Sequence, residues 1–287
     1  MPRREAPPYG KEVAPRTRLA SELPPVIGHR GAAACAPENT LAGLRKASEL
    51  GCLWVEFDVR LTADGHLILL HDDRLERTTG GRGSAAALFL AALRRHDAGA
   101  WFDRGFKGEP VPTLAEAVAL LGELGIGANV ELKAARGREA ETGATAAAML
   151  GRLWPSQLAA PLISSFRQDA LAAARAGAPG IARGILFRAV PKNWRAVAES
   201  LDCAAIHADH RCLHPAIVAE IRELGYPVLA YTVNDSERAH TLFGWGVTSV
   251  FSDVPHILAV AGAVSGKCGI AAAKSKPAGS SPQGAVR

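Results

Sequence analysis

The stretch VEFDVRLTADGHLILLHDD, residues 55–73, holds two apolar runs that are separated by a very short connection. Only LTADG lies between the run at 53–60 and the run at 66–72. A parallel crossover takes about 10–12 residues, and Asp64-Gly65 is typical of a hairpin turn. We therefore expect the run at 66–72 to fold back antiparallel onto 53–60, above the rim of the sheet to which 53–60 belongs.

Nine apolar or β-branched runs of strand length recur through the middle of the chain, and most are separated by helix-like patterns. The nine runs are 26–31, 53–60, 66–72, 128–133, 161–166, 182–187, 203–209, 227–234 and 247–253. The clearest helix-like segments are 40–50, 113–124 and 215–224. Once the antiparallel arm is set aside, eight alternating strands predict an α/β fold, a (β/α)₈ TIM barrel. An open sheet or a pair of small domains is the weaker alternative, because no GxGxxG motif follows the first strand.

The charge of the chain is unevenly distributed. The 287 residues carry a formal net charge of +5, which invites a nucleic-acid interpretation. Residues 1–22 carry a net +2 and residues 263–287 a net +4, so residues 23–262 carry a net −1. Both ends have the composition of disordered tails. We therefore expect one barrel domain at 23–262 between two disordered tails, with no nucleic-acid partner. We interpret the long connection at about 73–112 as an insertion that covers one side of the expected active site.

Other features bear on the compartment. The longest apolar run, residues 85–93, is too short for a membrane span, which takes about 20 residues. No apolar stretch typical of a signal peptide lies near the N-terminus. The five cysteines are scattered without a CxxC pair and indicate neither a zinc site nor a disulfide framework. These features predict a cytoplasmic protein without a membrane span, and they leave the oligomeric state open.

Charged residues stand at the C-terminal ends of the expected strands, where barrel enzymes place their active sites. Glu56 and Asp58 are two residues apart on one strand, so their side chains share a face. Glu131 and Lys133 have the same relation on the next barrel strand. Three carboxylates at one point repel one another unless a cation neutralises them, and oxygen ligands suit Mg²⁺ or Ca²⁺, with Mn²⁺ as a third candidate. The alternative is a structural network of salt bridges with Arg60 and Lys133.

Two cations and two histidines accompany these carboxylates. Arg30 and Lys133 beside a metal ion would form a cradle for a phosphoryl group. His29 and His71 would flank it, one accepting a proton from the nucleophile and the other donating one to the leaving oxygen. In the alternative interpretation, His29 is a rim histidine with satisfied hydrogen bonds and His71 stabilises the end of the hairpin. His207 stands at a later strand end and is interpreted only as a rim contact.

Seven short motifs, taken in order, resemble the glycerophosphodiester phosphodiesterase family. They are GHRGAAACAPENT (28–40), VEFDVRLTADG (55–65), LLHDDRLERTT (69–79), NVELK (129–133), SSF (164–166), YTVN (231–234) and FSDVP (251–255). The similarity covers about residues 24–260. Each motif alone is weak, but the ordered set, with the long insertion after His71, is specific.

This resemblance implies a barrel-fold, metal-dependent hydrolase. Its reaction would cleave glycerophosphodiesters, such as glycerophosphocholine or glycerophosphoethanolamine, to sn-glycerol 3-phosphate and an alcohol. The implied roles are acid/base catalysis for His29 and His71, phosphate contact for Arg30 and Lys133, and metal ligation for Glu56, Asp58 and Glu131. Tyr231 stands where many relatives have Trp, and it implies an aromatic wall in the pocket for the alcohol.

Two other functions stay open. One is a sibling phosphodiesterase that acts on lysophospholipids or sphingomyelin in a phospholipase D-like reaction. Such a lipid substrate needs an apolar rim, and the apolar residues of the insertion that could provide one are Leu88, Phe89, Leu90, Trp101, Phe102 and Phe106. The other is a barrel that binds phosphodiesters without turnover. The presence of both histidines and all three carboxylates argues against this second alternative.

Overall fold

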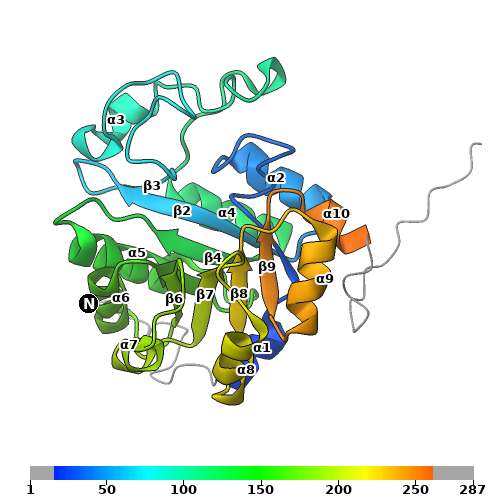
Figure 1. The fold of residues 1–287 in the computed structure, drawn as a ribbon. Coiled ribbons are helices and arrows are strands. Elements are labelled where there is room, and N and C mark those ends of the chain that lie inside the picture. Colours follow the sequence, from blue (N-terminus) through cyan, green and yellow to red (C-terminus); the bar gives the residue numbers. More distant parts are fainter. Residues whose placement is uncertain (1–15, 261–287) are drawn as a thin grey trace, which may run out of the picture.

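Eight parallel strands close into a barrel within residues 16–260, the part of the chain that the computed structural model describes (Figure 1). The barrel strands are β1 (Val26–Gly28), β2 (Trp54–Leu61), β4 (Gly127–Leu132), β5 (Leu162–Ser165), β6 (Ala182–Phe187), β7 (Ala205–Asp209), β8 (Val228–Tyr231) and β9 (Ser249–Ser252). They pair in chain order, and β1 closes the ring by pairing with both β9 and β2. The predicted (β/α)₈ barrel is therefore confirmed, and each strand overlaps the run that was expected to form it.

The hairpin expected from the short LTADG connection is present. Strand β3 (Leu67–Leu69) pairs antiparallel with the end of β2, with Leu67 opposite Leu61 and Leu69 opposite Val59. The parallel pairing of β2 with β4 stops at Val59, so the end of β2 projects beyond the barrel and carries β3 with it. The hairpin thereby brings His71 back to the rim of the barrel.

Helices cover the outside of the barrel (Figure 1). They are α2 (Leu41–Glu49), α4 (Leu114–Leu124), α5 (Glu139–Leu153), α6 (Gln168–Gly177), α7 (Trp194–Ser200), α8 (Pro215–Glu223), α9 (Ser236–Gly244) and α10 (Pro255–Val260). Two of them begin at threonine caps that satisfy otherwise unpaired backbone N–H groups. Thr40 accepts from the backbone of Gly43, and Thr113 forms a reciprocal capping box with Glu116.

The insertion after the hairpin lies on the β2–β3 side of the barrel (Figure 1). It contains η1 (Ala85–Ala87), α3 (Leu90–Leu93) and η2 (Arg104–Phe106). It has a small apolar cluster of its own, in which Leu75, Leu93 and Val111 are buried against the hairpin residues Ile68 and Leu70. This cluster holds the irregular segment against the barrel.

One boundary differs from the sequence-based expectation. Helix α1 (Arg16–Glu22) occupies the last part of the segment that was expected to be a disordered tail at 1–22. Leu19 and Leu23 are buried in an apolar cluster with Trp54, Leu162 and Phe251 at the N-terminal end of the barrel. Leu23 directly follows the helix, and its backbone N–H donates to the carbonyl oxygen of Leu19 at 3.1 Å. The rest of both expected tails, residues 1–15 and 261–287, lies outside the described residues.

Replacing Leu19 with alanine is expected to lower the free energy of unfolding by about 2–4 kcal/mol, because it leaves a cavity under the barrel. Urea unfolding of the full chain measures this change. The matched control is Arg18→Ala, which removes an exposed ion pair with Glu22 and is expected to leave the urea midpoint unchanged. If the two variants behave alike, α1 does not contribute to the core.

Candidate active site

A pocket of about 200 Å³ lies at the C-terminal ends of the barrel strands. Seven of the eight site residues expected from the sequence line it: His29, Arg30, Glu56, His71, Glu131, Lys133 and Tyr231. The eighth, Asp58, is buried beside them and lies 3.4 Å from Lys133 Nζ. Barrel closure has therefore brought together residues that are separated by as many as 202 positions in the chain.

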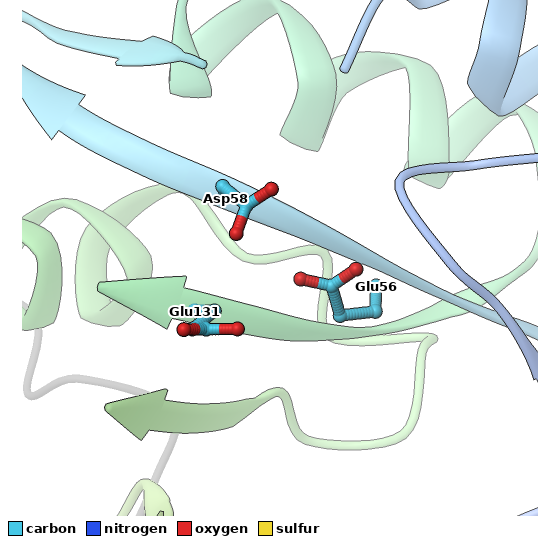
Figure 2. Close-up of side chains that lie close together, drawn as sticks. All are labelled: Glu56, Asp58 and Glu131. Carbon is cyan, nitrogen blue, oxygen red and sulfur yellow. The ribbon is translucent and has the colours of Figure 1, made fainter. Parts of the chain in front are cut away.

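The three acidic residues converge on one point. Glu56 and Asp58 project from β2 and Glu131 projects from β4, where it is the direct neighbour of Asp58 (Figure 2). One oxygen from each carboxylate lies within 4.8 Å of the other two. All three side chains are buried, and Glu56 Oε1 has no hydrogen-bond partner among the described residues. An orphaned carboxylate oxygen in such a cluster fits a hard divalent cation.

The pKa shifts of these carboxyl groups also fit a bound divalent cation. Burial raises the pKa of Glu56 well above its usual range, and the charges of Asp58 and Glu131 raise it further. Burial would also raise the pKa of Asp58, but Lys133 and Arg30 outweigh that effect and hold it below its usual range. A bound divalent cation would restore the ionised form of Glu56, because the opposite charge favours the carboxylate.

Salt bridges satisfy part of this cluster. Arg30 Nε lies 3.4 Å from Asp58 Oδ2, and Lys133 pairs with both Asp58 and Glu131. Glu56 Oε2 accepts the backbone N–H of Arg30 at 3.0 Å, and His29 Nε2 lies 3.8 Å from the same oxygen. Arg60, which was considered as a salt-bridge partner, instead donates to the carbonyl oxygen of His71 at 2.7 and 3.0 Å. The salt-bridge alternative therefore accounts for Asp58 and Glu131, whereas Glu56 forms no salt bridge with a lysine or arginine among the described residues.

His29 and His71, the two histidines expected to act in catalysis, are each held by a carboxylate at Nδ1. His29 Nδ1 donates to Asp253 Oδ1 at 2.7 Å, and Asn234 Nδ2 donates to the other oxygen of Asp253 at 2.7 Å. His71 Nδ1 donates to Asp72 Oδ1 at 2.7 Å. In both rings this leaves Nε2 as the nitrogen for proton exchange with a substrate, the arrangement that acid/base catalysis requires.

The loop after β1 positions two of these groups through its backbone. Arg30 adopts φ = 50° and Gly31 φ = 89°, so the chain turns sharply at the end of the strand. A Cβ at Gly31 would lie 2.6 Å from the backbone of Gly43, which shows how closely the loop packs against α2. Asn39, farther along the loop, donates to Asp58 Oδ2 at 2.8 Å and accepts from the Asp58 backbone at 2.9 Å. The left-handed Arg30 is a strained residue at a site of function.

Several supporting residues were not singled out from the sequence. Asn39, Asp72, Asn234 and Asp253 all stand within the family motifs, which were the available signal for them. Their partners are long-range: Asp253 pairs with a histidine 224 positions earlier in the chain. The role of such a residue becomes visible only once the barrel is closed.

A network of ion pairs joins the two histidine segments. Arg77, at the start of the insertion, donates to Glu38 at 2.7 and 2.8 Å and to Asp72 at 2.6 and 3.1 Å. Glu38 also accepts from Arg30 at 2.7 Å. Through Asp72 the network reaches His71. The loop after β1 and the loop after β3 are therefore fixed relative to each other.

The far wall of the pocket is aromatic. Tyr231 donates its hydroxyl to the carbonyl of Phe187 at 2.8 Å, and its ring contacts Phe166 edge-to-face with the centroids 6.0 Å apart. Lys133 Nζ lies 5.5 Å from the centroid of the Phe166 ring. The Tyr231 hydroxyl therefore bonds to the backbone, and Tyr231 and Phe166 both line the pocket.

The interpretation of His207 as a rim contact was wrong. Its ring is fully buried inside the barrel, below the rim, where it packs against Phe251 with the centroids 5.4 Å apart. The error has a simple source. β7 ends at Asp209, two residues beyond His207. His207 therefore lies within the strand and not at its C-terminal end.

Comparison with known proteins agrees with this geometry. Residues 29–257 match the model of the glycerophosphoryl diester phosphodiesterase family. The chain belongs to this family. A glycerophosphodiester phosphodiesterase of Caldanaerobacter subterraneus subsp. tengcongensis is 31% identical over 81% of this chain and 95% of its own length. The resemblance found in the seven motifs is therefore confirmed.

Solved structures of the family share the barrel. A phosphodiesterase from Oleispira antarctica, solved with the product sn-glycerol-3-phosphate, is 43% identical and has a TM-score of 0.82 over 84% of this chain and 97% of its own. A glycerophosphodiester phosphodiesterase from Agrobacterium tumefaciens is 28% identical, with a TM-score of 0.71 over 83% of this chain and 100% of its own. The expected enzyme class, glycerophosphodiester phosphodiesterase, is thereby confirmed. Between residues 16 and 260, no helix has the length and apolar character of a membrane span.

Proposed function

We propose that the protein hydrolyses glycerophosphodiesters, such as glycerophosphocholine and glycerophosphoethanolamine, to sn-glycerol 3-phosphate and an alcohol. The observation that carries this proposal is the convergence of three buried carboxylates and two carboxylate-held histidines on one pocket. The Oleispira antarctica phosphodiesterase supports it, because that protein was solved with sn-glycerol-3-phosphate. We further infer a cytoplasmic location from the sequence features.

The proposed roles follow from position. Glu56, Asp58 and Glu131 would hold one divalent cation, Mg²⁺ or Ca²⁺ with Mn²⁺ as a third candidate, which supplies Lewis-acid stabilisation of the phosphoryl oxygens when bound. Arg30 and Lys133 line the same pocket and would neutralise the remaining phosphoryl charge. His29 and His71 would transfer the protons. The ring of Tyr231 would contact the leaving alcohol.

An enzyme-coupled assay for sn-glycerol 3-phosphate tests the proposal. Glycerophosphocholine is supplied to the protein before and after EDTA treatment, and Mg²⁺, Ca²⁺ and Mn²⁺ are then added back singly. We expect release of sn-glycerol 3-phosphate that EDTA stops and at least one of the three ions restores. Release that is indifferent to EDTA would refute the metal site, and no release with any ion would refute the activity.

A lipid substrate is the second candidate, favoured by two exposed aromatic residues of the insertion. Phe89 is 63% exposed and Trp101 is 39% exposed, so both offer apolar surface that a lipid tail could contact. The pocket itself is small and charged, which favours the short glycerol substrates. Turnover of glycerophosphocholine and of lysophosphatidylcholine, compared at equal concentration, separates the two. Faster cleavage of lysophosphatidylcholine would reverse the preference proposed here.

Asp253 is expected to act by positioning His29. Asp253→Asn should lower kcat by roughly 10²–10⁴-fold with a small change in KM, because the amide no longer fixes the tautomer with a proton on Nδ1. Steady-state kinetics with glycerophosphocholine measures both constants. The control is Glu237→Gln, an exposed carboxylate at the start of α9, which should leave both constants unchanged. Equal kinetics for the two variants would remove Asp253 from the catalytic arrangement.

A further inference from the structure

His207 occupies a prepared space inside the barrel. Its ring lies beside Gly184 on the neighbouring strand β6, where a Cβ would come within 2.5 Å of His207 Nε2. Glycine at 184 is therefore what admits an imidazole at 207. On its other side the ring packs against Phe251. The side chain has no exposed surface, so it is held at a defined position below the rim.

This buried ring lacks partners within the described residues. Neither Nδ1 nor Nε2 of His207 makes a hydrogen bond there. Burial lowers the pKa of His207 to about 3, so the ring is neutral and offers one donor and one acceptor. Nearby, Asn129 uses its Nδ2 to bond Ser164 at 3.0 Å, but its Oδ1 has no partner in the same part of the chain. Leaving a buried polar group unsatisfied costs about 1–3 kcal/mol, so these atoms favour the binding of a hydrogen-bonding partner.

The pocket is where that partner would enter. His207 and Asn129 both line it, on β7 and β4, and the rest of its inner lining includes the apolar side chains of Leu186 and Phe251. The unpaired atoms thus lie between these apolar side chains and the buried carboxylates, since Asn129 is the neighbour of Glu56 in the sheet. They lie on the inner side of the pocket, since both residues are at most 1% exposed, whereas the side chain of His71 at the mouth is 31% exposed.

The chemistry of this inner lining, the floor of the pocket, selects one part of the substrate. A phosphodiester held at the carboxylates would extend one arm to the buried part of the lining that contains His207 and Asn129. This buried position suits the part that all the substrates have in common. That part is glycerol, whose hydroxyl groups each donate and accept and so match a neutral imidazole and an amide oxygen.

We propose that His207 and Asn129 bind the hydroxyl groups of the glycerol arm and so determine the specificity of the enzyme for glycerol-bearing phosphodiesters. This inference rests on the proposed hydrolysis of glycerophosphodiesters. It adds a direction to that function: glycerol is seated in the barrel, and the variable alcohol leaves through the mouth.

Isothermal titration calorimetry of the full chain in saturating Mg²⁺ tests the inference with two ligands, sn-glycerol 3-phosphate and n-propyl phosphate. They share the phosphate and the three-carbon chain, but n-propyl phosphate has no hydroxyl groups. We expect wild type to prefer sn-glycerol 3-phosphate. His207→Phe should weaken that ligand by about tenfold or more and change n-propyl phosphate by less than about twofold. His207→Gln keeps a donor and an acceptor and should retain most of the preference.

The control is Leu186→Ala, which removes apolar floor without a hydrogen-bonding group and should weaken both ligands by a similar factor. Thermal unfolding checks each variant, and His207→Leu replaces His207→Phe if the phenylalanine does not fold. Equal losses for both ligands in His207→Phe, or no loss for either, would overturn the inference. If instead wild type releases no sn-glycerol 3-phosphate from glycerophosphocholine with any added ion, the proposed function fails, independently of His207.

Discussion

Glu56→Gln is expected to abolish turnover and at the same time to stabilise the metal-free protein. The substitution removes one of three carboxylates that converge within 4.8 Å, and with it the charge that would balance a divalent cation. We expect kcat for glycerophosphocholine to fall by at least roughly 10²–10³-fold, since stabilisation of the phosphoryl charge is lost. The coupled assay with saturating Mg²⁺, Ca²⁺ or Mn²⁺ measures this loss.

The stability change has the opposite sign because burial and the neighbouring carboxylates outweigh the contacts of Glu56 with Arg30. The pKa of Glu56 is raised well above the usual range by burial and by Asp58 and Glu131. A carboxyl whose pKa is raised on folding costs nothing at a pH below its unfolded pKa of about 4.3, and its cost grows as the pH rises from there. In EDTA, Glu56→Gln should therefore unfold at higher urea than wild type near pH 7.5, by about 1–3 kcal/mol, and the difference should shrink near pH 4.5.

The exposed residue Glu123 provides the control, because Glu123→Gln removes a carboxylate of similar size on the surface of the protein. It should change neither turnover nor the urea midpoint. A Glu56→Gln protein that is less stable than wild type in EDTA would show that the surrounding groups already compensate this charge. The cluster would then be a structural network of salt bridges, the alternative left open by the sequence.

The features that were predictable from the sequence depend on local spacing. The five-residue connection LTADG was too short for a crossover, and the hairpin of β2 and β3 followed from it. The two-residue spacing within 56–58 and 131–133 placed side chains on shared faces, and this needed only the geometry of a strand. Barrel closure then placed the two pairs side by side.

The features that were missed depend on closure of the barrel. Leu19 and Leu23 have no apolar partners in their own segment, and they become core residues only because the base of the barrel presents Trp54 and Phe251 to them. The pairing of His29 with Asp253 likewise joins the first and last strands of the ring. Local sequence patterns carry no information on such contacts between segments that are distant in the chain.

Alanine substitution of His29 or His71 should lower turnover strongly, and a substrate with a better leaving group should distinguish the two variants. His29→Ala and His71→Ala should each lower kcat for glycerophosphocholine by roughly 10²–10⁴-fold, the usual contribution of a general acid or base. Burial lowers the pKa of His71, and the charges of Arg30 and Lys133 lower it further, while Asp58 and Asp72 oppose this shift. Because the net shift favours the neutral ring, we propose His71 as the base and His29 as the general acid.

A p-nitrophenyl diester of glycerol 3-phosphate tests this assignment, because its leaving group departs as a stable phenolate and needs no proton from the protein. With this substrate, His29→Ala should recover most of the wild-type rate, whereas His71→Ala should stay slow, since the nucleophile still requires a base. Recovery by His71→Ala alone would exchange the two roles, and recovery by neither would place both histidines outside proton transfer to the leaving group.

The same reactions followed by ³¹P NMR identify the nucleophile. A cyclic glycerol phosphate that accumulates in either variant means that the neighbouring glycerol hydroxyl attacks first, and its absence in both favours direct attack by water. A hydroxyl nucleophile would also require the glycerol arm to be held beside the base, which is the placement that the barrel floor at His207 and Asn129 would provide.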